Sequence, residues 1–220
     1  MTRVSVVTTT YNEREYVRPF VERVRQALRE VEHEIIIVDD SSPDGTYEEA
    51  CKWADKALLV KNAGQTIGLL TGLRAAKYPI VVTLDIDLEN PPELIPGMLN
   101  VFLEKNLDLL VACRTIIPRI SERFTSKTIG RIVGIRDFYS NFRVYRRDLF
   151  KDFKPRFKES FGGEFIVYAW INKYRLGEYF YDPPPRRKKP RIGGRLRANI
   201  RIFSVTMKLL TYLLFTRPKK

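Results

Sequence analysis

Short apolar runs alternate with amphipathic stretches along the first 115 residues of the chain. The apolar runs are rich in Val and Ile without polar alternation, which is typical of strands in a sheet covered on both faces. The stretches between them space apolar residues three or four positions apart, as in an amphipathic helix. The pattern predicts strands at Val4–Thr8, Glu34–Asp39, Ala57–Val60, Ile80–Leu84 and Asp108–Cys113, and helices at Arg14–Glu30, Tyr47–Ala54, Thr66–Lys77 and Pro92–Lys105. This rhythm predicts an α/β fold with a mainly parallel sheet and helices on both sides.

The second part of the chain is less regular. Its pattern predicts helices at Ser121–Val133 and Gly163–Tyr174, a helical turn at Arg147–Phe150, and strands at Phe142–Tyr145 and Glu178–Tyr181. The prolines at 183–185 then end the globular body, because proline stiffens the chain and cannot donate to a sheet. We therefore expect one folded domain over residues 1–185 and a distinct segment over residues 186–220.

The last segment combines a basic part with an apolar part. Arg186–Arg197 contains two glycines and is predicted to be a loop, whereas Asn199–Phe215 is predicted to be a helix. Its longest charge-free run, Leu209–Thr216, is eight residues long, and a membrane span needs about twenty. One stripe of the helix holds Ile202, Val205, Leu209, Tyr212 and Leu213. An amphipathic helix in the plane of a membrane fits this pattern, and a helix packed on the body or on a second subunit is the alternative.

Positive charge is concentrated in the same segment. The 220 residues carry a formal net charge of +13, from 39 Lys and Arg against 26 Asp and Glu. Residues 183–220 contain twelve basic residues and no acidic one, so the body before them is close to neutral. A basic stretch this dense usually contacts phosphates, in nucleic acid or at a membrane surface.

The few cysteines and the single histidine exclude several kinds of site. Cys51 and Cys113 lack the spacing of a zinc or redox pair, which favours a reduced intracellular compartment. His33 is the only histidine, so serine-hydrolase triads, histidine-ligated zinc and histidine general bases are almost excluded. The N-terminus runs directly into the first predicted strand, and we expect no signal peptide.

Polar and acidic residues follow three of the predicted strands. Thr9-Thr10-Tyr11-Asn12-Glu13 ends the first strand, Asp39-Asp40-Ser41-Ser42 the second, and Asp85-Ile86-Asp87-Leu88-Glu89 the fourth. Parallel strands bind ligands at their carboxyl ends, so these residues are expected to meet at one edge of the sheet. One Asp after a strand is often only a turn or a helix cap. Three acidic strand ends on one edge repel one another unless a cation or hydrogen-bond donors compensate them.

The Asp85-x-Asp87 pair is the clearest candidate for a metal site. With Glu89 it offers the hard oxygen ligands that suit Mg²⁺ or Mn²⁺. The chain has no Walker-type or G-x-G-x-x-G loop, so a substrate diphosphate would depend mainly on the metal and on basic side chains.

Several of these segments resemble one known family. Thr10-Tyr11-Asn12-Glu13, Val38-Asp39-Asp40-Ser41-Ser42-Pro43-Asp44-Gly45-Thr46 and Asp85-Ile86-Asp87-Leu88-Glu89-Asn90-Pro91-Pro92-Glu93 are similar to the three signatures of family-2 glycosyltransferases with the GT-A fold. The branch that they resemble most is dolichol-phosphate mannose synthase. Two later segments resemble that branch as well, Val111-Ala112-Cys113-Arg114 and Asp137-Phe138-Tyr139-Ser140-Asn141-Phe142-Arg143. The resemblance covers about residues 3–195 and implies a GT-A, Rossmann-like sheet flanked by helices, followed by the basic amphipathic helix.

The resemblance also implies roles for individual residues. The implied contacts to a nucleotide sugar are Thr9, Tyr11, Glu13, Val38, Asp40, Asp85, Ile86, Asp87 and Arg114. The implied catalytic residues are Asp87, Arg114, Asp137, Arg191 and Arg195, and the implied metal ligands are Asp85, Asp87 and Glu89. The basic stretch 186–195 would close over the donor and receive a lipid phosphate.

The sequence departs from the family pattern at four places. Thr9 stands where proline is frequent, Glu89 where glutamine is usual, and Asn141 where glycine is common. The stretch from Arg191 to Leu196 matches the family's basic motif only loosely.

These features together predict an inverting transfer of a hexose to a lipid phosphate. The expected donor is GDP-mannose, the acceptor dolichyl or polyprenyl phosphate, and the cofactor Mg²⁺ or Mn²⁺. The enzyme is expected to sit peripherally on the cytoplasmic face of a membrane and to bind no nucleic acid. The same chemistry with UDP-glucose, another nucleotide sugar or another acceptor is the first alternative.

A second alternative is a nucleic-acid-binding protein that uses the basic segment. It explains the charge but not the acidic strand ends, and aromatic residues for base stacking are absent between Arg186 and Arg201. A separate question concerns Arg123, Lys127 and Arg131, which recur every four residues. They fit either a solvated helix face or a surface that faces the acceptor and the membrane.

Overall fold

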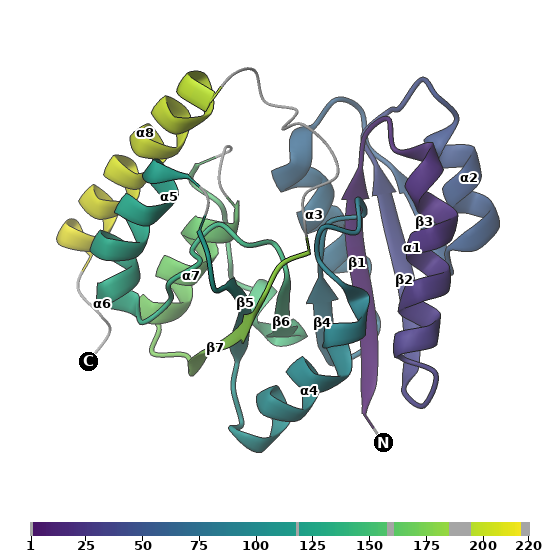
Figure 1. Ribbon diagram of the computed structural model, residues 1–220, viewed down its shortest axis with the longest axis horizontal. Coiled ribbons are helices and arrows are strands. Elements are labelled where there is room, and N and C mark those ends of the chain that lie inside the picture. The colour runs from purple at the N-terminus through teal and green to yellow at the C-terminus, as the bar shows by residue number, and fades with distance from the viewer. Residues whose placement is uncertain (1, 118, 158–160, 185–194, 217–220) are drawn as a thin grey trace.

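A twisted sheet forms the centre of the molecule in the computed structural model (Figure 1), which describes residues 2–117, 119–157, 161–184 and 195–216. Within these residues, seven strands join in the order β3-β2-β1-β4-β6-β5-β7. They are β1 (Arg3–Thr10), β2 (Glu32–Asp39), β3 (Lys56–Leu59), β4 (Ile80–Thr83), β5 (Leu109–Arg114), β6 (Arg143–Arg146) and β7 (Leu176–Tyr181). The strand order reverses direction beside β1, which is where open sheets of this kind bind ligands.

The sheet is mainly parallel, as the sequence predicts. β1 pairs in parallel with both β2 and β4, β2 pairs with β3, and β5 pairs with β7. β6 lies between β4 and β5 and runs antiparallel to both. The strands β1, β2 and β4 therefore end at one edge of the sheet, which brings the loops after them together.

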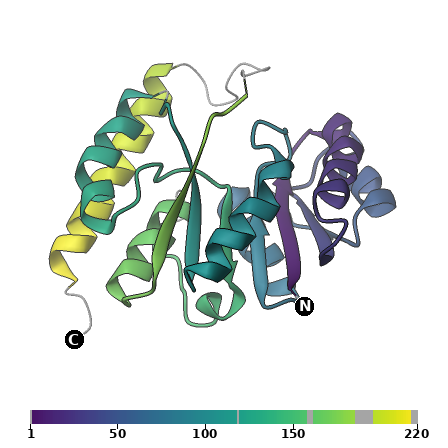
Figure 2. The same cartoon turned by 60° about the horizontal axis from the view of Figure 1, so that its bottom comes forward.

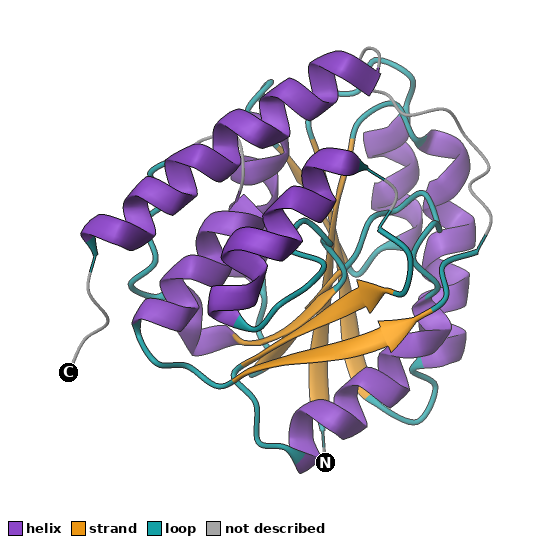
Figure 3. Ribbon diagram, turned by 60° about the vertical axis from the view of Figure 1, so that its left-hand side comes forward, coloured by secondary structure: helices purple, strands orange, loops and turns teal. Residues whose placement is uncertain are grey.

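Helices cover both faces of the sheet, as Figure 3 shows. They are α1 (Arg14–Ala27), α2 (Thr46–Trp53), α3 (Gly64–Ala75), α4 (Ile95–Glu104) and α7 (Phe161–Ile171), with short 3-10 turns η1 (Pro92–Leu94) and η3 (Arg147–Phe150). Apolar residues of α1, α2 and α4 pack with one face of the sheet, and those of α3 and α7 pack with the other. β-branched residues at successive strand positions serve both layers, which is why the strands show no polar alternation.

The predicted helix at residues 121–133 is a single helical run with a wider turn inside it. It consists of α5 (Ile120–Thr125), the π-helical turn η2 (Ser126–Gly130) and α6 (Arg131–Val133). Gly134 ends the run in the left-handed conformation with φ 76°, which glycine adopts without strain.

The C-terminal helix α8 (Arg195–Phe215) packs on the body through the stripe that was expected to face a membrane. Val205 and Leu209 are buried in the core cluster that also contains residues of α3 and α7. Thr206 is fully buried, and its hydroxyl lies 2.7 Å from that of Thr125. The expectation for this stripe was therefore wrong, because the body of the domain covers it: Val205 and Leu209 join the core, and the ring of Tyr212 packs against that of Phe157. The division at residues 185 and 186 stays a prediction.

The structure also bears on the basic stretch before α8, which was predicted to be a loop. The predicted loop at residues 186–197 was wrong at its end, since α8 already begins at Arg195, where good helix formers follow the two glycines. Residues 185–194 lie outside the described part of the chain, and Arg191 lies with them. Among the described helices, none combines the length and the apolar character needed to cross a membrane.

Candidate active site

The loops after β1 and β2 are tied together by hydrogen bonds at the carboxyl edge of the sheet. The backbone N–H of Asn12 donates to Ser42 Oγ at 2.9 Å, and that of Glu13 donates to Thr46 Oγ1 at 3.0 Å. Asp39 in turn accepts the backbone N–H of Ser42 at 2.8 Å. The small polar residues of the second motif thus fix the first motif in place, which holds Glu13 at the edge.

Backbone strain gathers in the same loops. Asn12, Ser41, Asn62 and Leu88 have φ values of 55°, 61°, 44° and 62°, and each follows the carboxyl end of a parallel strand. Residues other than glycine rarely adopt this conformation, and a branched side chain such as that of Leu88 does so least readily. Strain of this kind concentrates at functional sites, where the surrounding structure holds it.

The residues expected to contact a nucleotide fall into three environments. Tyr11 is 46% exposed on the edge, while Glu13 beside it is buried and accepts the Thr10 hydroxyl at 3.2 Å. Asp40 accepts the backbone N–H groups of Ala63 at 2.7 Å and Gly64 at 2.9 Å, so its carboxylate already caps the start of α3. These roles stay predictions.

Three other residues of that set are less available. Val38 and Ile86 are 0% and 1% exposed and belong to the two hydrophobic clusters, so only their main chain could touch a ligand. Thr9 is half-buried, and its Cγ2 would lie 3.1 Å from a Cβ added to Gly68. Thr9 therefore fixes how closely α3 approaches the sheet.

Four carboxylates meet around Asp85 at the end of β4. Burial, and then the negative charge of Asp87, raises the pKa of the Asp85 carboxyl to about 6, and Glu13 and Glu89 add to this effect. The hydrogen bond from Asn141 acts in the opposite direction. The convergence predicted from the strand ends is therefore present, and the site concentrates negative charge that a cation would relieve.

The implied metal ligands do not form a complete set of three. Asp87 Oδ1 accepts the backbone N–H of Glu89 at 3.1 Å, which closes a tight turn between them. In the described part of the chain, no three Asp, Glu, Cys or His side chains are gathered at coordinating distance. Asp85 and Asp87 fit a divalent ion that takes its remaining oxygen ligands from a diphosphate and water, which is the usual habit of Mg²⁺.

The raised pKa of Asp85 makes a prediction about stability. The pKa of this carboxyl is 3.8 in the unfolded chain and about 6 in the folded chain. Its ionisation therefore lowers the free energy of unfolding above pH 6 and has no effect on it below pH 3.8. We expect Asp85→Asn to raise the melting temperature of the metal-free protein by roughly 2–6 °C at pH 7.5. The relief of the ionisation cost exceeds the loss of the one amide hydrogen bond that Asn cannot accept, and 1 kcal/mol corresponds to about 2–4 °C in a chain of this size. The gain should shrink as the pH falls to 4. Thermal unfolding at both pH values measures it, and an equal gain at both would contradict the assignment.

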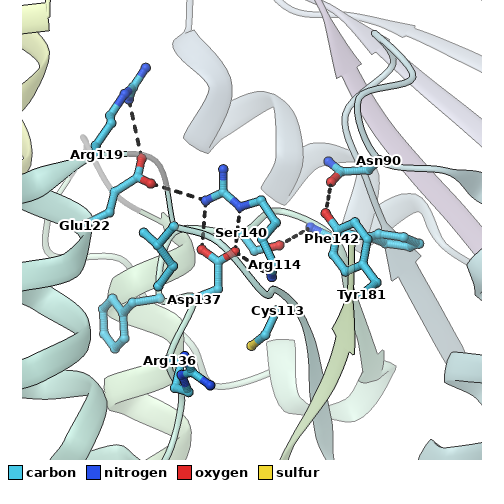
Figure 4. A network of polar contacts seen from close by, with 12 residues as sticks. Asn90, Cys113, Arg114, Arg119, Glu122, Arg136, Asp137, Ser140, Phe142 and Tyr181 are labelled. Atoms are coloured by element: carbon cyan, nitrogen blue, oxygen red, sulfur yellow. Dashed lines mark hydrogen bonds and ion pairs between the residues drawn. The ribbon is translucent and has the colours of Figure 1, made fainter. Parts of the chain in front are cut away.

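An ion pair between Arg114 and the buried Asp137 lies at the end of β5 (Figure 4). Arg114 donates to Asp137 through Nε at 2.6 Å and through a terminal nitrogen at 2.9 Å, and it reaches Glu122 of α5 at 3.3 Å. Burial alone would lower the pKa of Arg114, but the hydrogen bonds and charge of Asp137 raise it. Arg114 is therefore a fixed cation whose charge Asp137 already balances, and Asp137 orients it rather than facing a sugar alone.

A cationic pocket opens next to this pair. Its volume is about 760 Å³, and it lies against the helical run 120–133. The lining residues are Thr115, Ile116, Ile117, Arg123, Ser126, Lys127, Arg131 and Arg136. None of these side chains is acidic, so the pocket suits an anion. Of the two earlier interpretations of Arg123, Lys127 and Arg131, this placement favours a ligand-facing surface.

Comparison with known proteins decides the family. The family model described as glycosyl transferase family 2 matches residues 5–163, which include the three motifs at the carboxyl edge. The chain belongs to this family. The recognition made from the motifs is confirmed, and the protein is a glycosyltransferase.

Two relatives of this glycosyltransferase act on lipid phosphates according to their names. The dodecaprenyl-phosphate galacturonate synthase of Rhizobium johnstonii is 30% identical over 98% of this chain and 68% of its own length. The dolichol-phosphate mannosyltransferase of Pyrococcus furiosus is 33% identical over 52% of this chain and 34% of its own length. The chain thus spans about a third of the second relative.

Solved structures show the same fold at low sequence identity. Glucosyl-3-phosphoglycerate synthase from Mycobacterium tuberculosis, in complex with Mn²⁺, uridine diphosphate and phosphoglyceric acid, matches with a TM-score of 0.77 at 16% identity. The match covers 100% of this chain and 80% of that one. The GT-A fold expected from the resemblance is confirmed.

Sequence reasoning missed several residues of the glycosyltransferase site. Asn90 and Asn141 donate to Asp85, and the Tyr181 hydroxyl donates to Asn90 Oδ1 at 2.7 Å. Arg143 is fully buried and donates to three backbone carbonyls. Asn141 carries a signal that could have been used, since it replaces a glycine of the family pattern. Tyr181 carries none.

The predicted basic residues are only partly placed. Arg195 is the first residue of α8, and Arg191 lies outside the described residues. Their catalytic roles stay predictions. Cys51 and Cys113 are both free, one exposed and one buried, so no disulfide joins them.

Proposed function

We propose that this glycosyltransferase moves a sugar from a nucleotide sugar to a polyprenyl phosphate at a membrane surface. One observation carries the proposal. The cationic pocket adjoins the Arg114–Asp137 pair through Thr115, and its basic lining residues belong to the helical run 120–133, which also carries exposed apolar side chains beside α8. An acceptor with a phosphate head and a hydrocarbon tail matches that order of surfaces. The family and the names of the relatives support the same substrate class.

The donor site belongs to the carboxyl edge of β1, β2 and β4. Asp85 and Asp87 would hold Mg²⁺ or Mn²⁺, because their crowded carboxylates fit a hard cation, and burial together with the charge of Asp87 raises the pKa of Asp85. The bound ion would stabilise the charge that develops on the leaving nucleoside diphosphate. Tyr11 is exposed at this edge, and its ring would stack on the base.

The acceptor needs positioning rather than strong deprotonation. A phosphate monoester has a second pKa of about 6 and is already a nucleophile near neutral pH. Arg123, Lys127 and Arg131 would hold its phosphate in the pocket, close to the sugar held beside Arg114. Two anionic substrates are brought together by fixed cations, which lowers the barrier to an inverting displacement.

The apolar face provides the contact with the membrane. We define the two-helix face as Ile120 and Phe124 of α5 together with Ile200, Phe203 and Met207 of α8. The rings of Phe124 and Phe203 lie 4.9 Å apart, and Ser121 donates to Asn199 at 2.6 Å, so the helices run side by side (Figure 2). Between 37% and 77% of each of the five side chains is exposed.

Charge selects a lipid surface as the occupant of this face. Arg123, Lys127, Arg131, Arg201 and Lys208 are exposed on the same two helical segments. Glu122 is the one acidic residue of the two segments, and it is buried against Arg114. Exposed apolar side chains flanked only by cations suit an anionic membrane, at about 1 kcal/mol for each basic residue near the surface. We include the cytoplasmic leaflet in the proposal, because both cysteines are free.

The identity of the donor is the finer part of the proposal. GDP-mannose remains the donor to test first, in line with the motifs and with the mannosyltransferase among the relatives. UDP-sugars are the alternative, since the glucosyl-3-phosphoglycerate synthase with the same fold is seen in complex with uridine diphosphate.

A panel of donors tests the function. The purified chain is incubated with GDP-mannose, UDP-glucose or UDP-galacturonate, with Mn²⁺ or Mg²⁺, and with a short polyprenyl phosphate. We expect transfer from one donor, dependent on the metal, and formation of a lipid-linked sugar seen by mass spectrometry. If no donor gives a lipid product, the assignment of polyprenyl phosphate as the acceptor is overturned. If a donor is hydrolysed without a lipid product, only the assignment of the donor site is supported.

A further inference from the structure

Asp85 is held from two sides by side-chain amides. Asn141 Nδ2 donates to Asp85 Oδ1 at 3.1 Å, and Asn90 Nδ2 donates to Oδ2 at 3.4 Å. Gln65 lies at 3.5 Å from Oδ1, at the limit of a hydrogen bond. Each carboxylate oxygen therefore has its own amide donor, which fixes the plane of the carboxylate as well as its position.

Both asparagines are themselves fixed by residues of distant strands. The Thr83 hydroxyl donates to the backbone carbonyl of Asn141 at 2.7 Å. The guanidinium of Arg143 ties down the preceding loop through the carbonyls of Ser140 at 2.6 Å and Phe138 at 3.0 Å. Asn141 is thus presented to Asp85 by a rigid loop.

Asn90 is oriented by Tyr181 at the end of β7 (Figure 4). The Tyr181 hydroxyl donates to Asn90 Oδ1 at 2.7 Å, which turns the amide NH₂ of Asn90 toward Asp85. The ring of Tyr181 packs edge-on against Phe142, with centroids 6.3 Å apart. The Tyr181 ring therefore has little freedom to withdraw from Asn90.

Such bracing counters a specific force. Asp87, Glu13 and Glu89 repel the carboxylate of Asp85, so without donors it would rotate away from them. Amide NH₂ groups hold it without adding positive charge, which leaves the charge to be balanced by a cation or a ligand donor. We infer that Asn141, and Tyr181 acting through Asn90, are positioning residues that keep Asp85 in the orientation that binds the metal–nucleotide complex. This inference rests on the proposed function for the role of Asp85.

The test uses Asn141→Ala and Tyr181→Phe, each of which removes one donor and leaves the backbone in place. Calorimetry measures binding of GDP and of UDP in the presence of Mn²⁺, and steady-state kinetics measures the donor KM and kcat. We expect each variant to weaken nucleotide binding by about fivefold to tenfold, the size of a lost hydrogen bond to a charged group. The donor KM should rise equally, with kcat at saturating donor changed by less than about twofold.

Two substitutions separate positioning from general packing. Asn141→Asp keeps the size of the side chain but replaces the donor with a like charge, so it should weaken nucleotide binding more than Asn141→Ala does. Asn172→Ala and Tyr78→Phe are matched controls, because they break hydrogen bonds to Tyr168 and Glu32 that have no link to Asp85. Both controls should bind nucleotide as the wild type does.

The outcomes distinguish this inference from the function beneath it. If the wild type binds GDP or UDP with Mn²⁺ and both donor-removing variants bind equally well, the inference is overturned and the proposed function stands. If Asn141→Asp binds as well as the wild type, the amide is not needed as a donor and the inference is also overturned. If the wild type binds neither nucleotide, the donor site itself is wrong, and both proposals fall.

Discussion

Asp87→Ala will reduce sugar transfer by at least about 10³-fold while the fold stays intact. Asp87 is half-buried beside Asp85 at the end of β4, where the two carboxylates would share the divalent ion. A divalent ion held there would stabilise the charge on the leaving diphosphate, and its loss would cost several kcal/mol, where each 1.36 kcal/mol is a factor of ten in rate.

The fold should tolerate this change for electrostatic reasons. The Asp87 side chain accepts a hydrogen bond from the backbone N–H of Glu89, and its negative charge raises the pKa of Asp85. Removing it relieves repulsion in the cluster, so the melting temperature of the metal-free protein should not fall by more than a few degrees. Asp148→Ala is the matched control, since Asp148 is exposed and pairs only with Lys151 among the described residues. If the Asp87→Ala variant keeps full activity, the assignment of Asp87 as a metal ligand is contradicted.

The pattern of apolar residues predicted most strands within one or two residues of their observed ends. This succeeded most clearly for β1, β2, β4 and β5, because these strands are buried on both faces and only a continuous apolar run satisfies that environment. The direction of β6 could not be predicted in the same way. Its short run, Arg143–Arg146, has no local feature that sets its partners, and its antiparallel place follows from pairing with β4 and β5.

The candidate site was predictable as far as the strand ends reach. The rule for parallel sheets brings Glu13, Asp85 and Asp87 to one edge, and in the structure Glu13 and Asp87 lie close enough to raise the pKa of Asp85. The hydrogen bonds that hold the site come from residues far along the chain. Asn141 lies 56 positions from Asp85, and Tyr181 lies 91 positions from Asn90, so no spacing in the sequence reports them.

The C-terminal helix illustrates why a broad apolar surface misleads. α8 is apolar on more than one side, and the hydrophobic pattern does not say which side the body covers. The inner stripe with Val205 and Leu209 belongs to the core, and the outer stripe with Phe203 and Met207 remains exposed. Deletion of residues 199–220 would therefore uncover the core, and it cannot test membrane contact cleanly.

Two point changes on the outer stripe give the cleaner test and the second large effect. We expect Phe203→Glu combined with Met207→Glu to weaken binding to vesicles of anionic lipid by at least about 100-fold. Both side chains are 46% exposed, so neither is needed in the core. Burial of such a side chain in lipid contributes up to about 1.5–3 kcal/mol, and each added negative charge opposes the surface by about 1 kcal/mol.

The control pair is Leu59→Glu with Leu103→Glu, which adds the same charge at positions 50% and 42% exposed, on β3 and α4, away from the two-helix face. It should bind vesicles within about threefold of the wild type, since net charge alone acts weakly once the face is intact. Transfer to polyprenyl phosphate embedded in vesicles should fall with binding in the Phe203/Met207 variant, whereas transfer to a short acceptor in detergent should not. Equal vesicle binding by the two variants would show that the face does not contact lipid.

A loss of transfer in detergent as well would place Phe203 and Met207 in the acceptor site itself, because detergent removes the need for membrane binding while leaving that site unchanged.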